Sequence, residues 1–178
     1  MVDKKKLRFK IGDWIVHHFH GVGKVNDIEE KGLDGEKNTF YKVTTKEIDY
    51  WIPIENDDQD HLEPIRSKED FDHAIETLSQ PPVAFSDHPQ SRKKQLQEKW
   101  QDGCLESRAE LIRDLNGRMI QDHLNFEEKE TLEKAISDFI REWIIVDKKI
   151  DSSQANIFIN QSLEKSINHI RKSNPVNN

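Results

Sequence analysis

Four histidines are the first residues of this chain that could carry chemistry, because imidazole rings are common zinc ligands. His17, His18 and His20 lie close together, and His61 follows much later in the sequence. If residues 17–20 continued a strand, His18 and His20 would share one face and His17 the other. A catalytic zinc site needs three converging ligands, and neither an HExxH spacing nor a carboxylate at fixed spacing accompanies these histidines. The pattern favours a polar turn between two strands, with a histidine-based metalloenzyme as the alternative.

The single cysteine, Cys104, is the other residue with reactive potential. It follows Gly103 at an expected helix start, where the helix dipole stabilises a thiolate. A histidine partner would have to come from a distant part of the sequence. The chain has no phosphate-binding loop, GxSxG motif or dinucleotide fingerprint. We therefore predict neither an enzyme nor a cofactor-binding protein.

Composition narrows the class of protein further. The 178 residues are 34% hydrophobic and 34% charged, which suits one large domain or two small ones. No apolar run approaches the roughly 20 residues of a membrane span, and the basic start lacks the apolar stretch of a signal peptide. One cysteine cannot form an internal disulfide, which is typical of proteins in a reducing cytosol. These features predict a soluble, cytoplasmic, bacterial protein that does not bind membranes.

The charge balance argues against direct binding of nucleic acid. The formal net charge is −7, and residues 1–66 contain 11 basic and 14 acidic residues, a net charge of −3. The remaining residues 67–178 contain 16 basic and 20 acidic residues, a net charge of −4. Because DNA binding depends on lysines and arginines that displace counterions, neither half is expected to bind DNA without help.

The two halves differ in their hydrophobic period. Residues 7–66 contain short apolar segments that Gly21-Val22-Gly23, Gly32 and Gly35 interrupt, which predicts a small, strongly bent antiparallel barrel. From Ser67 onward the period is helical, and Ser67 with Asp70 resembles a capping box that opens a helix through Leu78. We therefore predict an α+β chain with domains at 1–66 and 67–178, the second an all-α helical bundle.

Apolar stripes mark the later helices of this bundle. One expected helix ends near Gly103 and the next begins just after it, while the two that follow begin at the polar or acidic turns Asn125–Glu128 and Asp151–Ser153. Their expected core positions are Leu105, Ala109, Ile112, Leu115 and Met119, then Leu132, Ala135, Ile136, Phe139, Ile140, Trp143 and Ile144, and finally Ala155, Ile159, Leu163, Ile167 and Ile170.

Trp51 is the strongest candidate for a binding residue. In the strand pattern around it, Ile48, Tyr50 and Ile52 share one face, which leaves Asp49 and Trp51 on the other. If the isoleucines line the core, Trp51 lies outside, and exposed aromatic residues are favoured anchors of protein interfaces. The alternative is that Trp51 packs against the helical half. A basic run at residues 91–94 could contact phosphates or simply face solvent.

A series of short motifs runs through both halves of the chain. In the first half they are Phe9–Val16, His20–Val25, Ile28-Glu29, Ile52–Asn56 and Leu62–Arg66. In the helical half they are Glu98-Lys99, Asp102-Gly103, Ala109–Leu115, Leu124–Lys129 and Leu132–Ala135. In this order the motifs resemble the CarD/CdnL family of bacterial RNA polymerase-binding regulators, whose opening is shared with the transcription-repair coupling factor.

This resemblance implies a Tudor-like (SH3-like) barrel that docks on the lobe of the RNA polymerase β subunit, and a monomer without a cofactor. By position, the docking residues would be Lys31, Leu33 and Trp51, where family members often place an arginine at the position of Trp51. The helical domain would contact promoter DNA at the upstream edge of the bubble and stabilise the open complex, without reading base sequence. Tethering to the polymerase would bring weak phosphate contacts to a high effective concentration.

The DNA-contacting part of this resemblance has one departure. The family carries a wedge tryptophan before the basic helix start, and this sequence has none between Trp51 and Trp100. Phe85 is the candidate substitute, because phenylalanine can also insert between bases, and Arg92, Lys93 and Lys94 are the candidate phosphate contacts. Trp100 is expected to pack inside. The alternative function is a polymerase-binding adaptor or competitor that has lost the wedge and does not stabilise open complexes.

Overall fold

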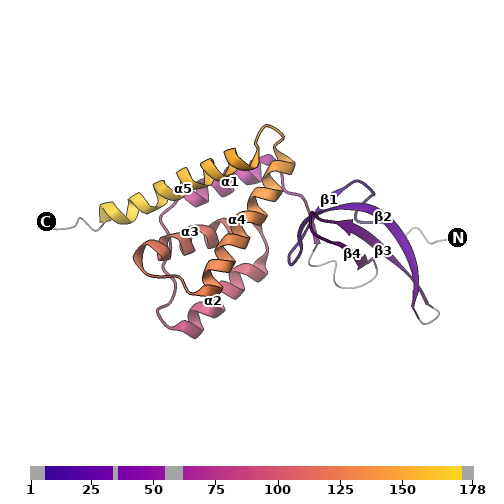
Figure 1. The fold of residues 1–178 in the computed structure, drawn as a ribbon, viewed down its shortest axis with the longest axis horizontal. Helices are drawn as coiled ribbons and strands as arrows, with labels where there is room; N and C mark the ends of the chain where they lie inside the picture. Colours follow the sequence, from indigo (N-terminus) through magenta and orange to yellow (C-terminus); the bar gives the residue numbers. More distant parts are fainter. Residues whose placement is uncertain (1–6, 34–35, 55–61, 174–178) are drawn as a thin grey trace. The chain divides into compact units, whose positions relative to one another are not determined.

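The computed structural model describes residues 7–33, 36–54 and 62–173. The chain divides into two compact units, the β unit Met1–Ile65 and the helical unit Arg66–Asn178. Antiparallel strands make up the described part of the first unit and α-helices that of the second (Figure 1). The expected α+β class, with a small antiparallel β domain followed by a helical bundle, is confirmed.

The β unit is one five-stranded sheet in the described residues, with the strand order β4-β3-β2-β1-β5. Every strand pair in it is antiparallel. The bounds are β1 Trp14–His17, β2 Gly21–Leu33, β3 Glu36–Thr44, β4 Asp49–Pro53 and β5 Leu62–Pro64.

One face of this sheet forms a small apolar core. Tyr41 and Val43 on β3 are fully buried, while Phe40 and Lys42 beside them are half-buried and belong to the opposite face. The Tyr41 hydroxyl accepts hydrogen bonds from the backbone N–H groups of Arg8 and Phe9, at 3.1 and 3.3 Å. The other core residues are Phe9, Ile15, Val25, Ile52 and Leu62.

The glycines of β2 are not the strand breaks that the sequence suggested. The turn between β1 and β2 falls at residues 18–20, and β2 begins at Gly21, whose φ of 70° suits glycine. Gly23 and Gly32 lie within β2, paired with Ile15 and Lys37. Close packing leaves no room for a side chain at Gly23, since a Cβ at this position would lie 2.6 Å from Cγ1 of Val43.

A β-bulge at Asn26 changes the facing of β2. Val25 pairs with Val43 and Asp27 with Lys42, so Asn26 is an extra residue that has no place in the register of β2 with β3. Its side-chain Nδ2 donates to Oγ1 of Thr44 at 2.6 Å. Before the bulge the odd-numbered Val25 faces the core, whereas beyond it Ile28 packs against the core.

Side-chain caps open several helices of the second unit. Ser67 and Asp70 form the expected capping box at the start of α1, and Asn125 and Glu128 form another at α4. Gly103, with a φ of 66°, ends α2. The bounds are α1 Lys68–Ser79, α2 Pro89–Asp102, α3 Leu105–Gln121, α4 Phe126–Val146 and α5 Ser152–Ser173. None of the described helices combines the length and apolar character that crossing a membrane requires.

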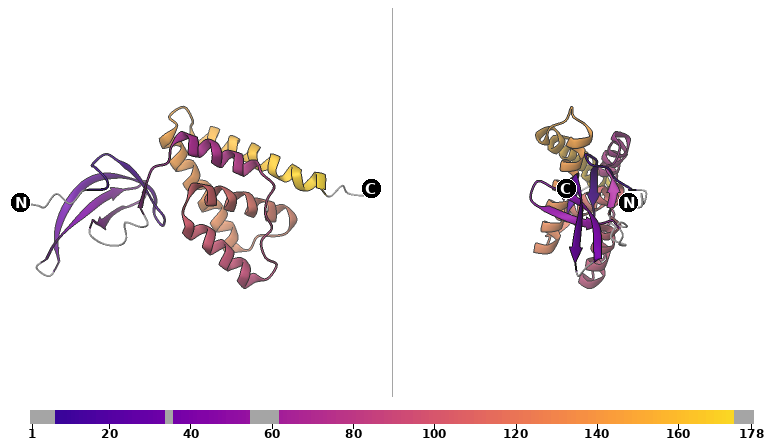
Figure 2. Two further views of the ribbon diagram at one scale, coloured as in Figure 1. Left: turned by 180° about the vertical axis from the view of Figure 1, so that it is seen from behind. Right: turned by 90° about the vertical axis from the view of Figure 1, so that its right-hand side faces the viewer.

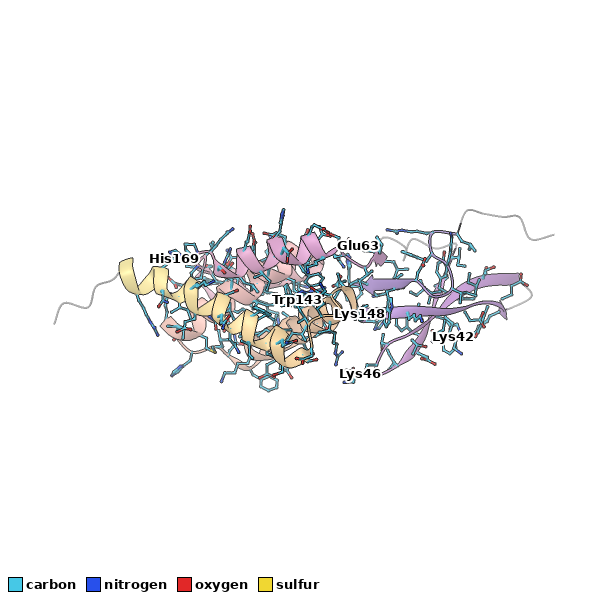
Figure 3. All side chains as sticks on the ribbon, turned by 90° about the horizontal axis from the view of Figure 1, so that it is seen from above. Lys42, Lys46, Glu63, Trp143, Lys148 and His169 are labelled. Carbon is cyan, nitrogen blue, oxygen red and sulfur yellow. The ribbon has the colours of Figure 1, made fainter. Side chains whose placement is uncertain are left out.

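Helix α3 is central in the helical unit, because it contacts the four other helices. Helix α5 runs alongside α1 (Figure 2), and Trp143 of α4 lies among the helices (Figure 3). The predicted apolar stripes are confirmed at most of the positions whose side chains are described, which do not include Ile170, and one position is corrected. Met119 is 45% exposed, because the stripe of α3 ends at Leu115 and the last turn of the helix leaves the core.

Candidate functional site

Trp51 lies on the outer face of the sheet, as its position in β4 predicted. Its neighbour Ile52 is 3% exposed and belongs to the core, whereas Trp51 is 40% exposed. Ile48 does not share the buried face as expected and is 49% exposed, because β4 begins only at Asp49.

The indole of Trp51 is fixed by hydrogen bonding to a neighbouring strand. Its Nε1–H donates to Oε2 of Glu29 on β2 at 2.8 Å. The Glu29 carboxylate also forms ion pairs with Lys31 Nζ at 3.4 Å and with Lys42 Nζ at 3.7 Å. One carboxylate therefore links an aromatic ring and two ammonium groups from three strands.

Both lysines also lie over the indole ring. Lys31 Nζ is 3.4 Å from the ring centroid of Trp51, and Lys42 Nζ is 5.7 Å away, so both contacts are cation–π interactions. In the register of the sheet, Lys42 pairs with Trp51, and Phe40 lies between Glu29 on β2 and Pro53 on β4. We call the residues Glu29, Lys31, Phe40, Lys42 and Trp51 the Trp51 face.

The electrostatics of the Trp51 face favour an ionised Glu29. The hydrogen bond from the Trp51 indole holds the pKa of Glu29 below its ordinary value of 4.5. The hydrogen bond and charge of Lys31 and the charge of Lys42 act in the same direction and outweigh the effect of desolvation. With Glu29 ionised and both lysines protonated, the Trp51 face carries one net positive charge in a domain that is acidic overall.

The sequence interpretation identified part of this face. Lys31 and Trp51 were predicted together, and the structure brings them into contact. Leu33 pairs with Glu36 at the end of the β2–β3 hairpin, and its side chain is not among those described. Glu29, Phe40 and Lys42 were missed. Alternation along β3 could have indicated Phe40 and Lys42, but the facing of Glu29 depends on the bulge at Asn26.

Arg92 is not the exposed phosphate contact that the basic run suggested. It is 9% exposed, and its Nε donates to Oε1 of Glu128 at 2.7 Å. Its Nη1 donates to the backbone carbonyls of Ser86 and Asp87 at 2.9 and 3.0 Å. The guanidinium therefore anchors the loop before α2 to α4, and this correction removes Arg92 from the candidate DNA contacts.

Glu128 is the buried centre of this anchor. Desolvation opposes its ionisation, but the backbone N–H of Asn125, the Arg92 hydrogen bond and the charges of Arg118 and Arg92 outweigh it and lower the pKa of Glu128. Because the pKa is lowered in the folded state, this contribution to stability is present above the ordinary pKa near 4.5 and is lost as the pH falls through the lowered value.

The burial of Phe85 also corrects the prediction that it is a DNA wedge. Its side chain is 9% exposed and belongs to the core of the helical unit. It could insert between bases only after leaving that core, so the described conformation does not present it as a wedge. Trp100 packs against the same core but is only half-buried, so the expectation that it packs inside is met in part.

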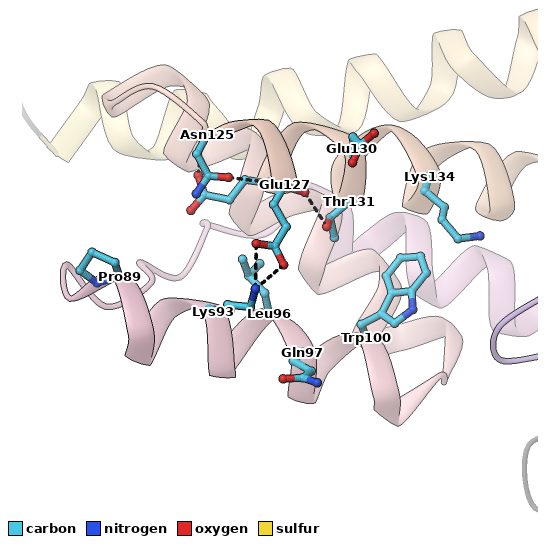
Figure 4. Close-up of a pocket in the computed structure, with 11 residues that line it drawn as sticks. Pro89, Lys93, Leu96, Gln97, Trp100, Asn125, Glu127, Glu130, Thr131 and Lys134 are labelled. Atoms are coloured by element: carbon cyan, nitrogen blue, oxygen red, sulfur yellow. Dashed lines mark hydrogen bonds and ion pairs between the residues drawn. The ribbon is translucent and has the colours of Figure 1, made fainter.

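Lys93 and Lys94 remain exposed on α2. The Lys94 side chain is 78% exposed and pairs with Glu98 at 3.6 Å, and the Lys93 side chain is 66% exposed and pairs with Glu127 of α4 at 3.0 Å. Lys93 and Glu127 point toward one another across a groove of about 520 Å³ between α2 and α4 (Figure 4). Surface pairs of this kind are weak, so both lysines can exchange their partners for phosphates.

The histidines form a polar turn with aromatic contacts, as favoured above. The face assignment was wrong, because β1 ends at His17 and residues 18–20 are a turn. The rings of His17 and His20 are 4.6 Å apart, and His20 is also 4.6 Å from the ring of Tyr50. His61 lies outside the described residues. Within residues 7–33, 36–54 and 62–173, no three His, Cys, Asp or Glu side chains are grouped to hold a metal ion.

Cys104 caps a helix in this structure. It is the N-cap of α3, and its Sγ accepts a hydrogen bond from the backbone N–H of Ser107 at 3.3 Å. The expected helix start is confirmed, and the half-buried thiol has a structural role there.

Family comparisons agree with the two-unit structure. Residues 9–66 match the CarD-like/TRCF RID domain, and residues 73–160 match the CarD C-terminal domain. The chain therefore belongs to the CarD-like family of transcription factors, and its function is transcription regulation associated with RNA polymerase. A relative is the Bacillus subtilis (strain 168) protein described as "Putative transcription factor YdeB". The two are 27% identical over 152 residues, which cover 84% of this chain and 99% of the relative.

Proposed function

We propose that this protein docks as a monomer on the lobe of the RNA polymerase β subunit through the Trp51 face. The observation that carries the proposal is the exposed indole of Trp51, held among two lysines on the outer face of the β unit. Large aromatic side chains surrounded by polar groups are typical anchors of protein interfaces. The match of residues 9–66 to the CarD-like/TRCF RID domain supports the same unit as the one that contacts polymerase.

Trp51→Ala tests the docking directly. We expect binding of the full chain to RNA polymerase from the same organism to weaken by about 30-fold or more, because an anchor residue contributes about 2 kcal/mol or more. The measurement is a titration of the polymerase with labelled chain at fixed salt.

Phe19→Ala is the matched control for this variant. Phe19 is another aromatic residue of the β unit and is 53% exposed, but it lies in the turn between β1 and β2. Its loss should leave polymerase binding within about twofold, as for most contacts outside an anchor. Equal effects of the two variants, or none from Trp51→Ala, would reject the Trp51 face as the docking site.

We further propose that Lys93 and Lys94 contact promoter DNA when the chain is bound to polymerase, and that these contacts prolong the open complex. Both side chains are well exposed at the start of α2, and their present partners are exposed glutamates. Because the chain has a net charge of −7, it should bind free DNA poorly. Tethering to polymerase raises the effective concentration of the two lysines near the duplex.

The double variant Lys93→Glu/Lys94→Glu tests the DNA contacts. Two lost phosphate contacts should shorten the lifetime of the open complex by about tenfold and reduce its salt dependence, since each contact adds about one to the salt slope. The control is Lys148→Glu/Lys149→Glu, an adjacent pair of exposed lysines in the turn before α5. Lifetimes are measured by competitor challenge at two salt concentrations.

The burial of Phe85 and Arg92 favours a second candidate function, a polymerase-binding adaptor or competitor without a DNA wedge. Under this alternative, the lysine variants behave like the wild-type chain in the lifetime assay, while Trp51→Ala still loses binding. The same pair of experiments therefore decides between the two functions.

A further inference from the structure

We propose that Glu29 is a positioning residue that holds Trp51 and Lys31 in their docking arrangement before the partner arrives. This inference rests on the proposed docking function of the Trp51 face. Glu29 was not among the predicted docking residues, and its role follows from the contacts of its carboxylate.

The two carboxylate oxygens of Glu29 contact different groups of the Trp51 face. Oε2 accepts the indole N–H of Trp51 at 2.8 Å and faces Lys31 Nζ at 3.4 Å, while Oε1 faces Lys42 Nζ at 3.7 Å. An indole at the surface has two soft torsions, and a lysine has four. Fixing such side chains in advance removes an entropy cost that binding would otherwise carry.

Glu29 also keeps two like charges together beside one ring. Lys31 and Lys42 both approach the face of Trp51, at 3.4 and 5.7 Å from its centroid. Without the negative charge of Glu29, their ammonium groups repel one another, and the indole N–H can donate only to a neutral acceptor, which forms a weaker hydrogen bond. The Trp51 face would then sample several arrangements, of which only a fraction is competent to bind.

Glu29→Gln tests the proposal with little change in shape. A reduced competent fraction lowers the observed association rate and leaves the dissociation rate unchanged. We expect association with RNA polymerase about tenfold slower, because the side chains of Trp51 and Lys31 must then be ordered during binding. A direct contact between Glu29 and the partner would instead raise the dissociation rate.

Glu30→Gln is the matched control, because it removes the same charge from the next residue of β2. Glu30 is exposed and pairs in register with Thr39, on the opposite face of the strand. Any general effect of net charge on the association rate appears equally in both variants, so only the difference between them reports positioning.

The indole N–H resonance of Trp51 in the ¹⁵N spectrum of the free chain is a second readout. In the wild type it should shift with pH as Glu29 titrates below its ordinary pKa, and this titration should vanish in Glu29→Gln but persist in Glu30→Gln. Trp51→Ala identifies the resonance. Thermal unfolding of each variant confirms that the β unit remains folded.

The outcomes separate this inference from the docking proposal. The positioning role is supported if Glu29→Gln, but not Glu30→Gln, displaces the indole resonance and associates more slowly. Three results of Glu29→Gln would overturn the positioning role and leave docking through Trp51 intact. They are an unchanged indole resonance, an association rate equal to that of Glu30→Gln, and weaker binding that comes only from faster dissociation. If Trp51→Ala binds like the wild type, the docking proposal fails, and the positioning role in docking fails with it.

Discussion

Replacing Glu142 by alanine is expected to destabilise the helical unit by about 3–5 kcal/mol, as for other buried ion pairs that lose one partner. Glu142 lies on α4 and is 1% exposed. Its carboxylate accepts hydrogen bonds from Nη1 of Arg108 at 3.2 Å and from the backbone N–H of Arg66 at 3.3 Å, and it pairs with Nη1 of Arg66 at 3.5 Å.

The cost comes from the charges that remain rather than from the attraction that is lost. The side chains of Arg66 and Arg108 are 8% and 10% exposed, so neither guanidinium recovers its hydration when Glu142 is removed. Nη2 of Arg66 still donates to the Gly103 carbonyl at 3.0 Å, but a neutral acceptor does not balance two cations.

The free energy of unfolding in urea, followed by far-ultraviolet circular dichroism, measures this effect. Glu133→Ala is the control, because Glu133 is an exposed glutamate on the same helix and should change stability by less than about 0.5 kcal/mol. A loss of less than about 1 kcal/mol for Glu142→Ala would contradict the buried ion-pair network.

Phe139→Ala is expected to cost a similar amount, about 3–5 kcal/mol, by opening a cavity in the core. Phe139 on α4 is fully buried, and its ring centroid lies 5.2 Å from that of Phe71 and 5.9 Å from that of Trp143, both in edge-on geometry. Phe71 and Trp143 are stacked at 6.0 Å. The substitution therefore removes one ring from a group of three that joins α1 to α4.

Phe126→Ala provides the contrast for this variant within the same helix. Phe126 is the first residue of α4 and is 75% exposed, so its loss should change the unfolding free energy by less than about 0.5 kcal/mol. Similar losses for the two phenylalanines in urea unfolding would mean that the described core is not the one that stabilises the unit.

Local signals in the sequence were sufficient to predict much of the fold. The capping box of Ser67 and Asp70 and the stripe from Leu105 to Leu115 depend on residues three or four positions apart, and both are present in the structure. Strand alternation placed Trp51 outside for the same reason. Such features are set by neighbours along the chain, so a single sequence contains them.

The fates of Arg92 and Phe85 depend on residues far away in the sequence. Arg92 was interpreted as part of a surface run, but Glu128, which lies 36 residues later, draws its guanidinium into the helical unit. Phe85 lies in a segment without regular structure, where no period indicates whether a side chain faces the core. Charge and residue type alone do not determine burial in either case.

The bulge at Asn26 has a consequence for how this family of sequences can change. Substitutions alter the Trp51 face one side chain at a time, and the sheet beneath it is unaffected. Deletion of the single codon for Asn26 would remove only the extra residue, because Val25–Val43 and Asp27–Lys42 are consecutive pairs once it is gone. Ile28 would still face the core and Glu29 the opposite face. Recognition by the β unit can therefore change through point mutations, and at this position β2 can also lose one residue without turning its outer face toward the core.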